Sequence, residues 1–103
     1  IAPASAEARY RIAEVLLAQK QLKEAKTQAS YAAQASGGSD YWVVKSYLLI
    51  ADILTEQKDY FNAKATLQSI IKNNNDKEIK GEATRKLENV KQLEKAQSKL
   101  TEE

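Results

Sequence analysis

The sequence predicts an all-α fold of five antiparallel helices, and three observations point to this class. Ala, Lys, Gln, Glu and Leu, all good helix formers, dominate the 103 residues, among which there are one Pro and three Gly. Apolar residues recur three and four positions apart in five segments, which is the spacing of one helix face. Short polar or Gly-containing stretches separate these segments, and no run reads as a strand of convincing length.

The first two predicted helices are joined by the polar connection Gln19-Lys20-Gln21. The first helix runs from about residue 4 to residue 20, and Pro3 suits its first turn because the missing N–H costs nothing there. We expect its apolar face to contain Ala8, Ile12, Val15, Leu16 and Ala18. The second helix ends before the Gly37-Gly38 pair, which tolerates a left-handed cap. Its apolar face is expected to contain Leu22, Ala25, Ala29, Ala32 and Ala33.

The third and fourth helices repeat this arrangement around a second polar connection, Glu56-Gln57-Lys58. Ser39 or Asp40 is placed to cap the third helix, and Asp59 is placed to cap the fourth, because their side-chain oxygens can accept from unpaired backbone N–H groups. The expected apolar residues of the third helix are Tyr41, Val44, Tyr47, Leu48, Ile50, Ala51 and Leu54. Those of the fourth are Tyr60, Ala63, Leu67, Ile70 and Ile71.

The last predicted helix runs from about residue 77 to residue 100, after an Asn-rich turn. Its apolar stripe, with heptad-like spacings of three and four, contains Ile79, Ala83, Leu87, Val90, Leu93, Ala96 and Leu100. It can be a cap that packs on the fourth helix, or its far half can project and join a neighbouring molecule. Because this helix is longer than the fourth, we expect an overhang of about 14 Å and weak self-association or fraying.

The composition excludes several functional classes. A net charge of only +2, with no basic stripe, argues against a nucleic-acid or acidic-membrane partner. The chain has no Cys and no His, which excludes disulfides, thiolate or imidazole metal sites and a Ser-His-Asp triad. No apolar run is long enough to span a membrane. The sequence therefore predicts no enzyme and no cofactor, and because it opens with Ile1 we expect a segment of a longer protein.

The two helix pairs are repeats of each other at a constant offset of 38 residues. Ile12-Ala13 aligns with Ile50-Ala51, and "QKQLKEA" at 19–25 aligns with "QKDYFNA" at 57–63. This offset divides residues 1–75 into two helix-turn-helix units, at about 4–38 and 40–75. Residues 76–103 form a C-terminal capping or extension helix.

This repeat resembles the tetratricopeptide repeat (TPR) family. The resemblance rests on small residues where the paired helices cross and on a large apolar residue before the second helix of each pair. In the second unit these are Ala51, Tyr60 and Ala63, and in the first they are Ala13, Leu22 and Ala25. Arg9 stands where an aromatic residue is usual, and both units lack the closing Pro. The second unit also resembles repeat segments of bacterial cell-envelope proteins, so a periplasmic or cell-envelope location is weakly favoured over the cytoplasm.

The resemblance implies a right-handed α-solenoid that acts as a non-catalytic protein–protein interaction module, with a peptide or protein surface as its partner. The alternative is a structural segment that extends or self-associates a solenoid through its last helix. Family members bind along the concave surface, and the alternative for these positions is a solvated face. The residues that the resemblance places on the concave surface are Tyr10, Glu14, Leu17, Lys45, Leu48, Asp52 and Thr55.

Two features of this surface need a separate interpretation. Tyr10 and Glu14 occupy places where some family members clamp a peptide carboxylate with Lys and Asn, so the resemblance does not extend to that clamp. Glu14 and Asp52 stand at equivalent positions and could suggest acid–base chemistry, but no other residue pattern supports catalysis. Trp42 is either an interaction hot spot or, as we favour, a cover over the junction between the two units.

Overall fold

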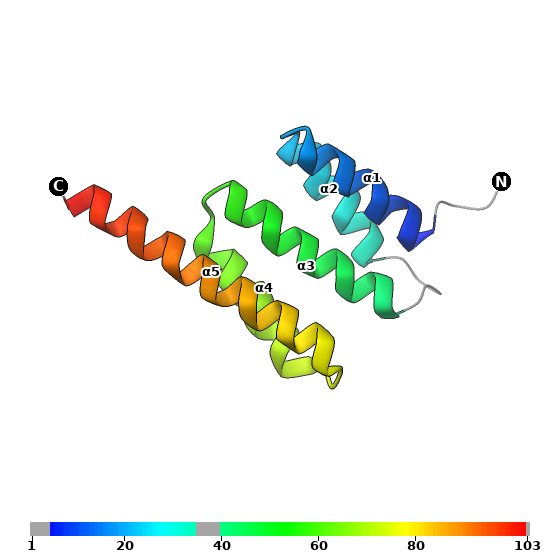
Figure 1. The fold of residues 1–103 in the computed structure, drawn as a ribbon. Coiled ribbons are helices and arrows are strands. Elements are labelled where there is room, and N and C mark those ends of the chain that lie inside the picture. Colours follow the sequence, from blue (N-terminus) through cyan, green and yellow to red (C-terminus); the bar gives the residue numbers. More distant parts are fainter. Residues whose placement is uncertain (1–4, 35–39, 103) are drawn as a thin grey trace.

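The computed structural model describes residues 5–34 and 40–102, and these residues form an all-α fold (Figure 1). The predictions for Pro3, for the Gly37-Gly38 pair, for Ser39 and for the side chain of Asp40 lie outside the part of the chain that the structure describes. The predicted helix order is confirmed, with boundaries within about two residues of those expected. The helices are α1 (Ala6–Ala18), α2 (Leu22–Ala33), α3 (Asp40–Glu56), α4 (Tyr60–Asn73) and α5 (Lys77–Glu102).

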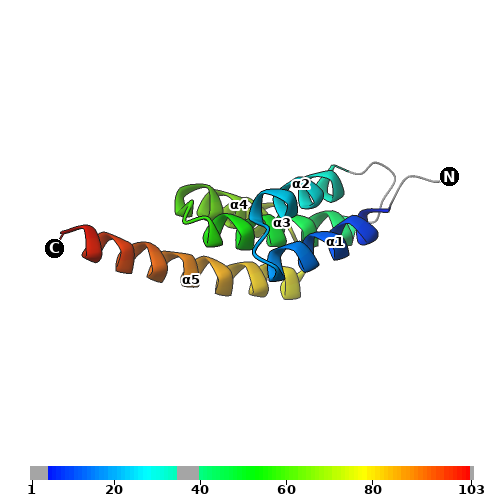
Figure 2. The same ribbon diagram turned by 90° about the horizontal axis from the view of Figure 1, so that it is seen from above.

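The helices stack as successive pairs, so the predicted solenoid of helix pairs is confirmed. Each helix packs against the next in the chain, and α3 also contacts both α1 and α5. Figure 2 shows α2 and α4 on one side of the molecule and α1 and α5 on the other. The result is an elongated body of 55 × 31 × 16 Å in which α3 is the central helix.

The turn inside each pair has the same geometry, which is direct structural evidence for the repeat. Lys20 and Lys58, 38 residues apart, both have a φ of 62° in the left-handed region. In each turn the N–H of this lysine donates to the carbonyl three residues earlier, at 2.9 Å and 3.0 Å. The next N–H donates to the carbonyl five residues earlier, at 2.9 Å and 2.8 Å. These bonds satisfy carbonyls that the preceding helix leaves unpaired at its C-terminus.

Side-chain caps fix the starts of the last two helices. The predicted cap by Asp59 is confirmed, because its Oδ1 accepts a hydrogen bond from the Asn62 N–H at 3.3 Å. Asp76 caps α5 in the same way, and its Oδ1 accepts from the Ile79 N–H at 3.1 Å. Both carboxylates lie at the positive end of a helix dipole, which adds to their stabilising effect.

The core consists of two clusters that meet at α3. Ile50 packs against both clusters, so α3 ties the first pair of helices to the second pair and α5. The first cluster contains Tyr10, Ala13, Ala25, Ala29, Ala32, Leu49 and Ile53. The second contains Leu48, Ala51, Leu54, Ala63, Leu67, Ile70, Ile79, Ala83, Leu87 and Val90.

The predicted apolar face of the first helix was wrong except at Leu16, which packs on the first cluster. Ile12 and Val15 are 47% and 56% exposed, and Ala8 and Ala18 are also exposed. The line that faces α2 and α3 instead contains Ala6, Tyr10 and Ala13, followed by the half-buried Leu16 and Leu17. Both lines have helical spacing, so periodicity alone did not distinguish the buried one from the exposed one.

Two further differences follow from how α3 and α5 pack. In α3 the predicted Tyr41 and Tyr47 are exposed, whereas Leu49 and Ile53 are buried because this helix is covered on two sides. In α5 the stripe is buried as far as Val90 and exposed beyond it, with Leu93 39% and Leu100 69% exposed. The predicted overhang of the last helix is therefore present.

Candidate partner-binding groove

The inner helices α1, α3 and α5 enclose a continuous groove. Two adjoining hollows of about 400 Å³ and about 270 Å³ share Leu17, Asp52 and Lys86 in their linings, so we treat them as one surface, the inner groove. The groove is lined by Tyr10, Glu14, Leu17, Ala18, Leu49, Asp52, Thr55, Glu56, Glu82, Lys86, Asn89 and Val90.

Five of the seven residues predicted on the concave surface line this groove. They are Tyr10, Glu14 and Leu17 from α1, and Asp52 and Thr55 from α3. Lys45 lies beside the groove, where its Nζ donates to Oε1 of the lining residue Glu82 at 3.3 Å. Leu48 does not belong to the surface, because it is 1% exposed and packs in the core against α4 and α5. Its inclusion was wrong: Leu48 lies a turn from Lys45 but on the side of α3 that faces the core.

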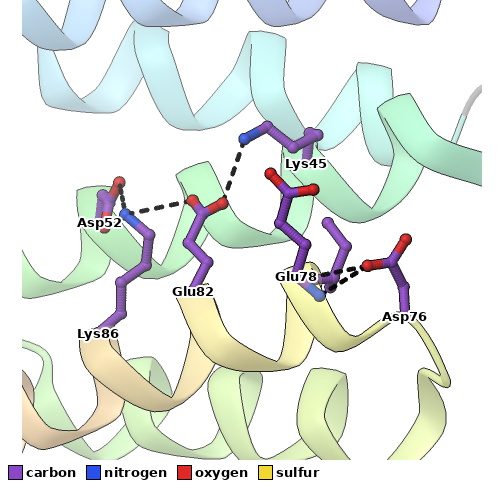
Figure 3. A network of polar contacts seen from close by, with 7 residues as sticks. Lys45, Asp52, Asp76, Glu78, Glu82 and Lys86 are labelled. Atoms are coloured by element: carbon purple, nitrogen blue, oxygen red, sulfur yellow. Dashed lines mark hydrogen bonds and ion pairs between the residues drawn. The ribbon is translucent and has the colours of Figure 1, made fainter.

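A chain of four charged side chains bridges α3 and α5 along the groove (Figure 3). The Lys86 ammonium donates to Asp52 Oδ1 at 2.9 Å and to Oδ2 at 2.8 Å. It also lies 3.8 Å from Glu82 Oε2, and Lys45 Nζ donates to Glu82 Oε1 at 3.3 Å. Burial raises the pKa of the Asp52 carboxyl above its ordinary value, and the bond from Lys86 opposes that rise. Two lysines and two carboxylates thus neutralise one another.

The α1 wall of the groove is held by a second polar contact. Tyr10 is buried, and its hydroxyl lies near the Glu14 carboxylate. Burial first, and then the neighbouring Glu14 charge, raise the pKa of this phenol to about 12. Arg11 Nη1 also donates to Glu14, at 3.1 Å. The Glu14 carboxylate is therefore oriented by its own helix and remains half-exposed to the groove.

The junction between the two units is covered by aromatic rings, as predicted for Trp42. The Tyr10 and Trp42 ring centroids lie 5.4 Å apart, and Trp42 packs on the first core cluster. The Arg11 guanidinium lies 5.1 Å from the Trp42 ring centroid, within the range of a cation–π contact. These contacts fix the end of the groove where α1 meets α3.

The residues that sequence reasoning missed come mainly from α5. Glu82, Lys86 and Asn89 line the groove because they lie next to the buried stripe on the side of α5 that faces α3. Their spacing of four and three positions parallels the apolar stripe, and this was the signal that could have found them. The helix was interpreted as a cap or an extension of the solenoid, so its inner face was not considered as a wall of the site.

A larger hollow of about 530 Å³ lies between α3 and α4, away from the predicted site. It carries no charged side chain and includes none of the residues predicted on the concave surface. Its lining consists of Val43, Val44, Tyr47, Ala65, Thr66, Ser69, Ile70, Asn73 and Asn74. Within residues 5–34 and 40–102, no cluster of His, Cys, Asp or Glu could hold a metal ion, and no helix is long and apolar enough to cross a membrane.

The fold and the groove together define a stack of helix hairpins with an inner surface built from successive first helices. Residues 45–74 match the family model described as a tetratricopeptide repeat, which spans most of α3, the Lys58 turn and all of α4. The chain therefore contains a tetratricopeptide repeat, within a TPR-like all-α solenoid. Repeats of this family are generally protein-interaction scaffolds. No curated protein and no solved structure matches the chain.

Proposed function

We propose that the chain is a non-catalytic interaction module that binds a segment of a partner protein in the inner groove. The observation that carries this proposal is that predicted surface residues from both repeats line one groove with the inner face of α5. The carboxylates of the groove already have partners within the fold, which supports binding rather than acid–base catalysis. A larger bacterial protein in the cell envelope remains the predicted context.

The lining indicates what the partner segment should carry. The half-buried Leu17 provides apolar surface in the groove, while Glu14 and Glu56 place carboxylates along it. The positive charge of Lys86 is taken up by Asp52 and Glu82. A segment with an apolar side chain flanked by basic or hydrogen-bond-donating residues therefore suits the groove, since the apolar contact supplies affinity and the carboxylates supply orientation.

The test is to select peptides from a display library on the folded chain and to measure their affinity for groove variants. Asn89→Arg places a long side chain inside the groove, and Glu14→Lys reverses a charge of the groove. Thr84→Arg is the matched control, because Thr84 is exposed on α5 but lies outside the groove lining. We expect each groove variant to weaken binding at least about tenfold, which is about 1.4 kcal/mol, and the control to leave it unchanged.

Two results would contradict the proposal. The first is that all selected peptides bind Asn89→Arg and Glu14→Lys as tightly as they bind the parent. The second is that Thr84→Arg weakens binding as much as the groove variants do, which would place the binding surface on the outer face of α5. Circular dichroism melts of all three variants verify that the fold is retained.

A further inference from the structure

In the first repeat, an arginine side chain lies in the angle between the two paired helices. Arg9 of α1 donates from Nη1 to Oε1 of Gln28 on α2 at 3.3 Å. Its guanidinium carbon lies 5.0 Å from the centroid of the Tyr31 ring, within the range of a cation–π contact. Within residues 5–34 and 40–102, Arg9 forms no ion pair. An aromatic ring and an amide oxygen are therefore its partners, and no carboxylate is needed to hold it.

The equivalent place in the second repeat is the hollow of about 530 Å³ between α3 and α4. At the 38-residue offset, the three residues of the Arg9 contact correspond to residues that all line this hollow, namely Tyr47, Thr66 and Ser69. The aromatic ring is thus on the first helix of the pair instead of the second. A threonine and a serine stand where the first repeat has the longer Gln28 and Tyr31. The space that the first repeat fills with its own arginine is therefore open in the second.

The hollow offers an aromatic ring beside apolar surface. Tyr47 is 41% exposed, and next to it in the lining are the half-buried Val43 and Val44 and the buried Ile70. A long side chain with a charged head can place its methylene groups on such a surface and its head over the ring. The ring face is the negative part of the aromatic quadrupole, so it is complementary to positive charge.

The polar side chains of the hollow add hydrogen-bond acceptors. Thr66 Oγ1 and Asn74 Nδ2 donate to backbone carbonyls four residues earlier, at 2.8 Å and 3.1 Å. Asn73 Nδ2 donates to Ser69 Oγ at 3.2 Å. The Oδ1 atoms of both asparagines and the oxygen of Thr66 can still accept hydrogen bonds. Since no charged side chain lines the hollow, a cationic group with several N–H donors meets attraction and no repulsion there.

We propose that this hollow binds an arginine side chain of a partner protein, in the way that the first repeat holds Arg9. The guanidinium lies over the Tyr47 ring, its stem contacts Val44 and Ile70, and its N–H groups donate to the side-chain oxygens of α4. A planar guanidinium suits this lining better than a lysine ammonium, because it stacks on a ring, presents five donors and is less strongly hydrated. The site shares no residue with the inner groove and does not depend on the function proposed for that groove.

The experiment titrates the folded chain with three capped tripeptides and follows the backbone amide signals by nuclear magnetic resonance. The peptides are acetyl-Ala-Arg-Ala-amide and its counterparts with lysine or leucine in the centre. The arginine peptide should shift the amide signals of Tyr47 and Ser69 with a dissociation constant in the millimolar range, as expected for one anchoring side chain. The lysine and leucine peptides should bind at least about fivefold more weakly.

Two variants and one control test the assigned contacts. Tyr47→Leu keeps an apolar side chain but removes the ring face, so it should weaken binding of the arginine peptide about threefold or more. The triple variant Tyr47→Arg, Thr66→Gln and Ser69→Tyr gives the second repeat the side chains of the first. Its own arginine then fills the hollow, and binding should be lost. Asn89→Arg, in the inner groove, is the control and should bind the arginine peptide as the parent does.

Each other outcome overturns the proposal in a recognisable way. Equal binding of the arginine and lysine peptides would indicate general charge attraction, and tighter binding of the leucine peptide would make the hollow an apolar docking surface. Undiminished binding to the triple variant, or weakened binding to Asn89→Arg, would place the peptide outside the hollow. No saturable shift at tens of millimolar peptide would exclude the site. The three substituted side chains of the hollow are exposed or half-buried, and circular dichroism melts verify that each variant is folded.

Discussion

The left-handed lysines in the two turns allow a sharp test of the repeat, with Lys58→Gly as the perturbation. A non-glycine residue in this conformation costs about 1–2 kcal/mol because its Cβ approaches the following carbonyl oxygen. Glycine removes that cost but adds about 0.4–1 kcal/mol of chain entropy to the unfolded state. The φ of 62° at Lys58 therefore predicts a net gain of about 0.5–1 kcal/mol in the free energy of unfolding. No ion pair of its side chain is lost, whereas Lys20 is paired with Glu56 at 3.2 Å.

The assay is urea denaturation followed by circular dichroism, with Lys26→Gly as the matched control. Lys26 is exposed in the interior of α2, where the same chemical change should cost about 0.5–1 kcal/mol. The two variants should therefore shift the unfolding midpoint in opposite directions with unchanged slope. A Lys58→Gly protein that is less stable than the parent would refute the assigned turn geometry.

Three further predictions use the same parent protein. Ala63 has no exposed surface, so Ala63→Leu should overpack the second cluster and lower stability by about 1–3 kcal/mol. Ala96→Leu, at an exposed position of α5, is the control and should change the melting temperature little; equal melts would contradict the helix pairing. Burial raises the pKa of Tyr10 to about 12, so its contribution to stability is present below pH ~10 and is lost as the pH rises toward ~12. In urea denaturation at several alkaline pH values, Tyr10→Phe should therefore lose less stability over that interval than the parent. Equal losses in the two proteins would refute the raised pKa of Tyr10. Leu93 and Leu100 are largely exposed, so changing both to Ser should leave the melting temperature of a dilute sample within a few degrees of the parent; a large loss would show that this half of α5 is packed on the repeats.

The fold could be predicted from the sequence because several local signals agree. Helix-forming composition, the 38-residue offset and the polar connections all indicated the same five elements. The buried side of α1 could not be predicted because α1 carries two apolar lines. Ile12 and Val15 correspond, 38 residues earlier, to Ile50 and Ile53 of α3, which pack against other helices. The line through Ile12 and Val15 is therefore as apolar as a buried face, although it is exposed on α1. Periodicity shows that a face is apolar but does not show what packs against it.

The candidate site was predictable only on the walls contributed by the repeats. Glu14 and Asp52 line the same hollow, and the repeat had assigned them equivalent positions on α1 and α3. The spacing of Lys86 places it beside the apolar stripe of α5, but this local signal does not show which side of the stripe faces α3, so Lys86 was missed. Its two short contacts to Asp52 are tertiary contacts over 34 positions in the chain.

The N-terminal half of α5 packs on α3 and α4, whereas its C-terminal half projects beyond them, because α5 is much longer than α4. At 1.5 Å per residue, the 14 residues of α4 extend about 21 Å and the 26 residues of α5 about 39 Å, so about 18 Å of α5 has no equivalent length of α4 beside it. The outer face of the packed half is polar, with Lys80, Thr84 and Lys91 exposed. At the other end of the stack, α1 exposes Ile12 and Val15. The two ends of the stack therefore differ chemically, because the packed half of α5 closes its end with a polar face whereas α1 leaves an apolar face uncovered.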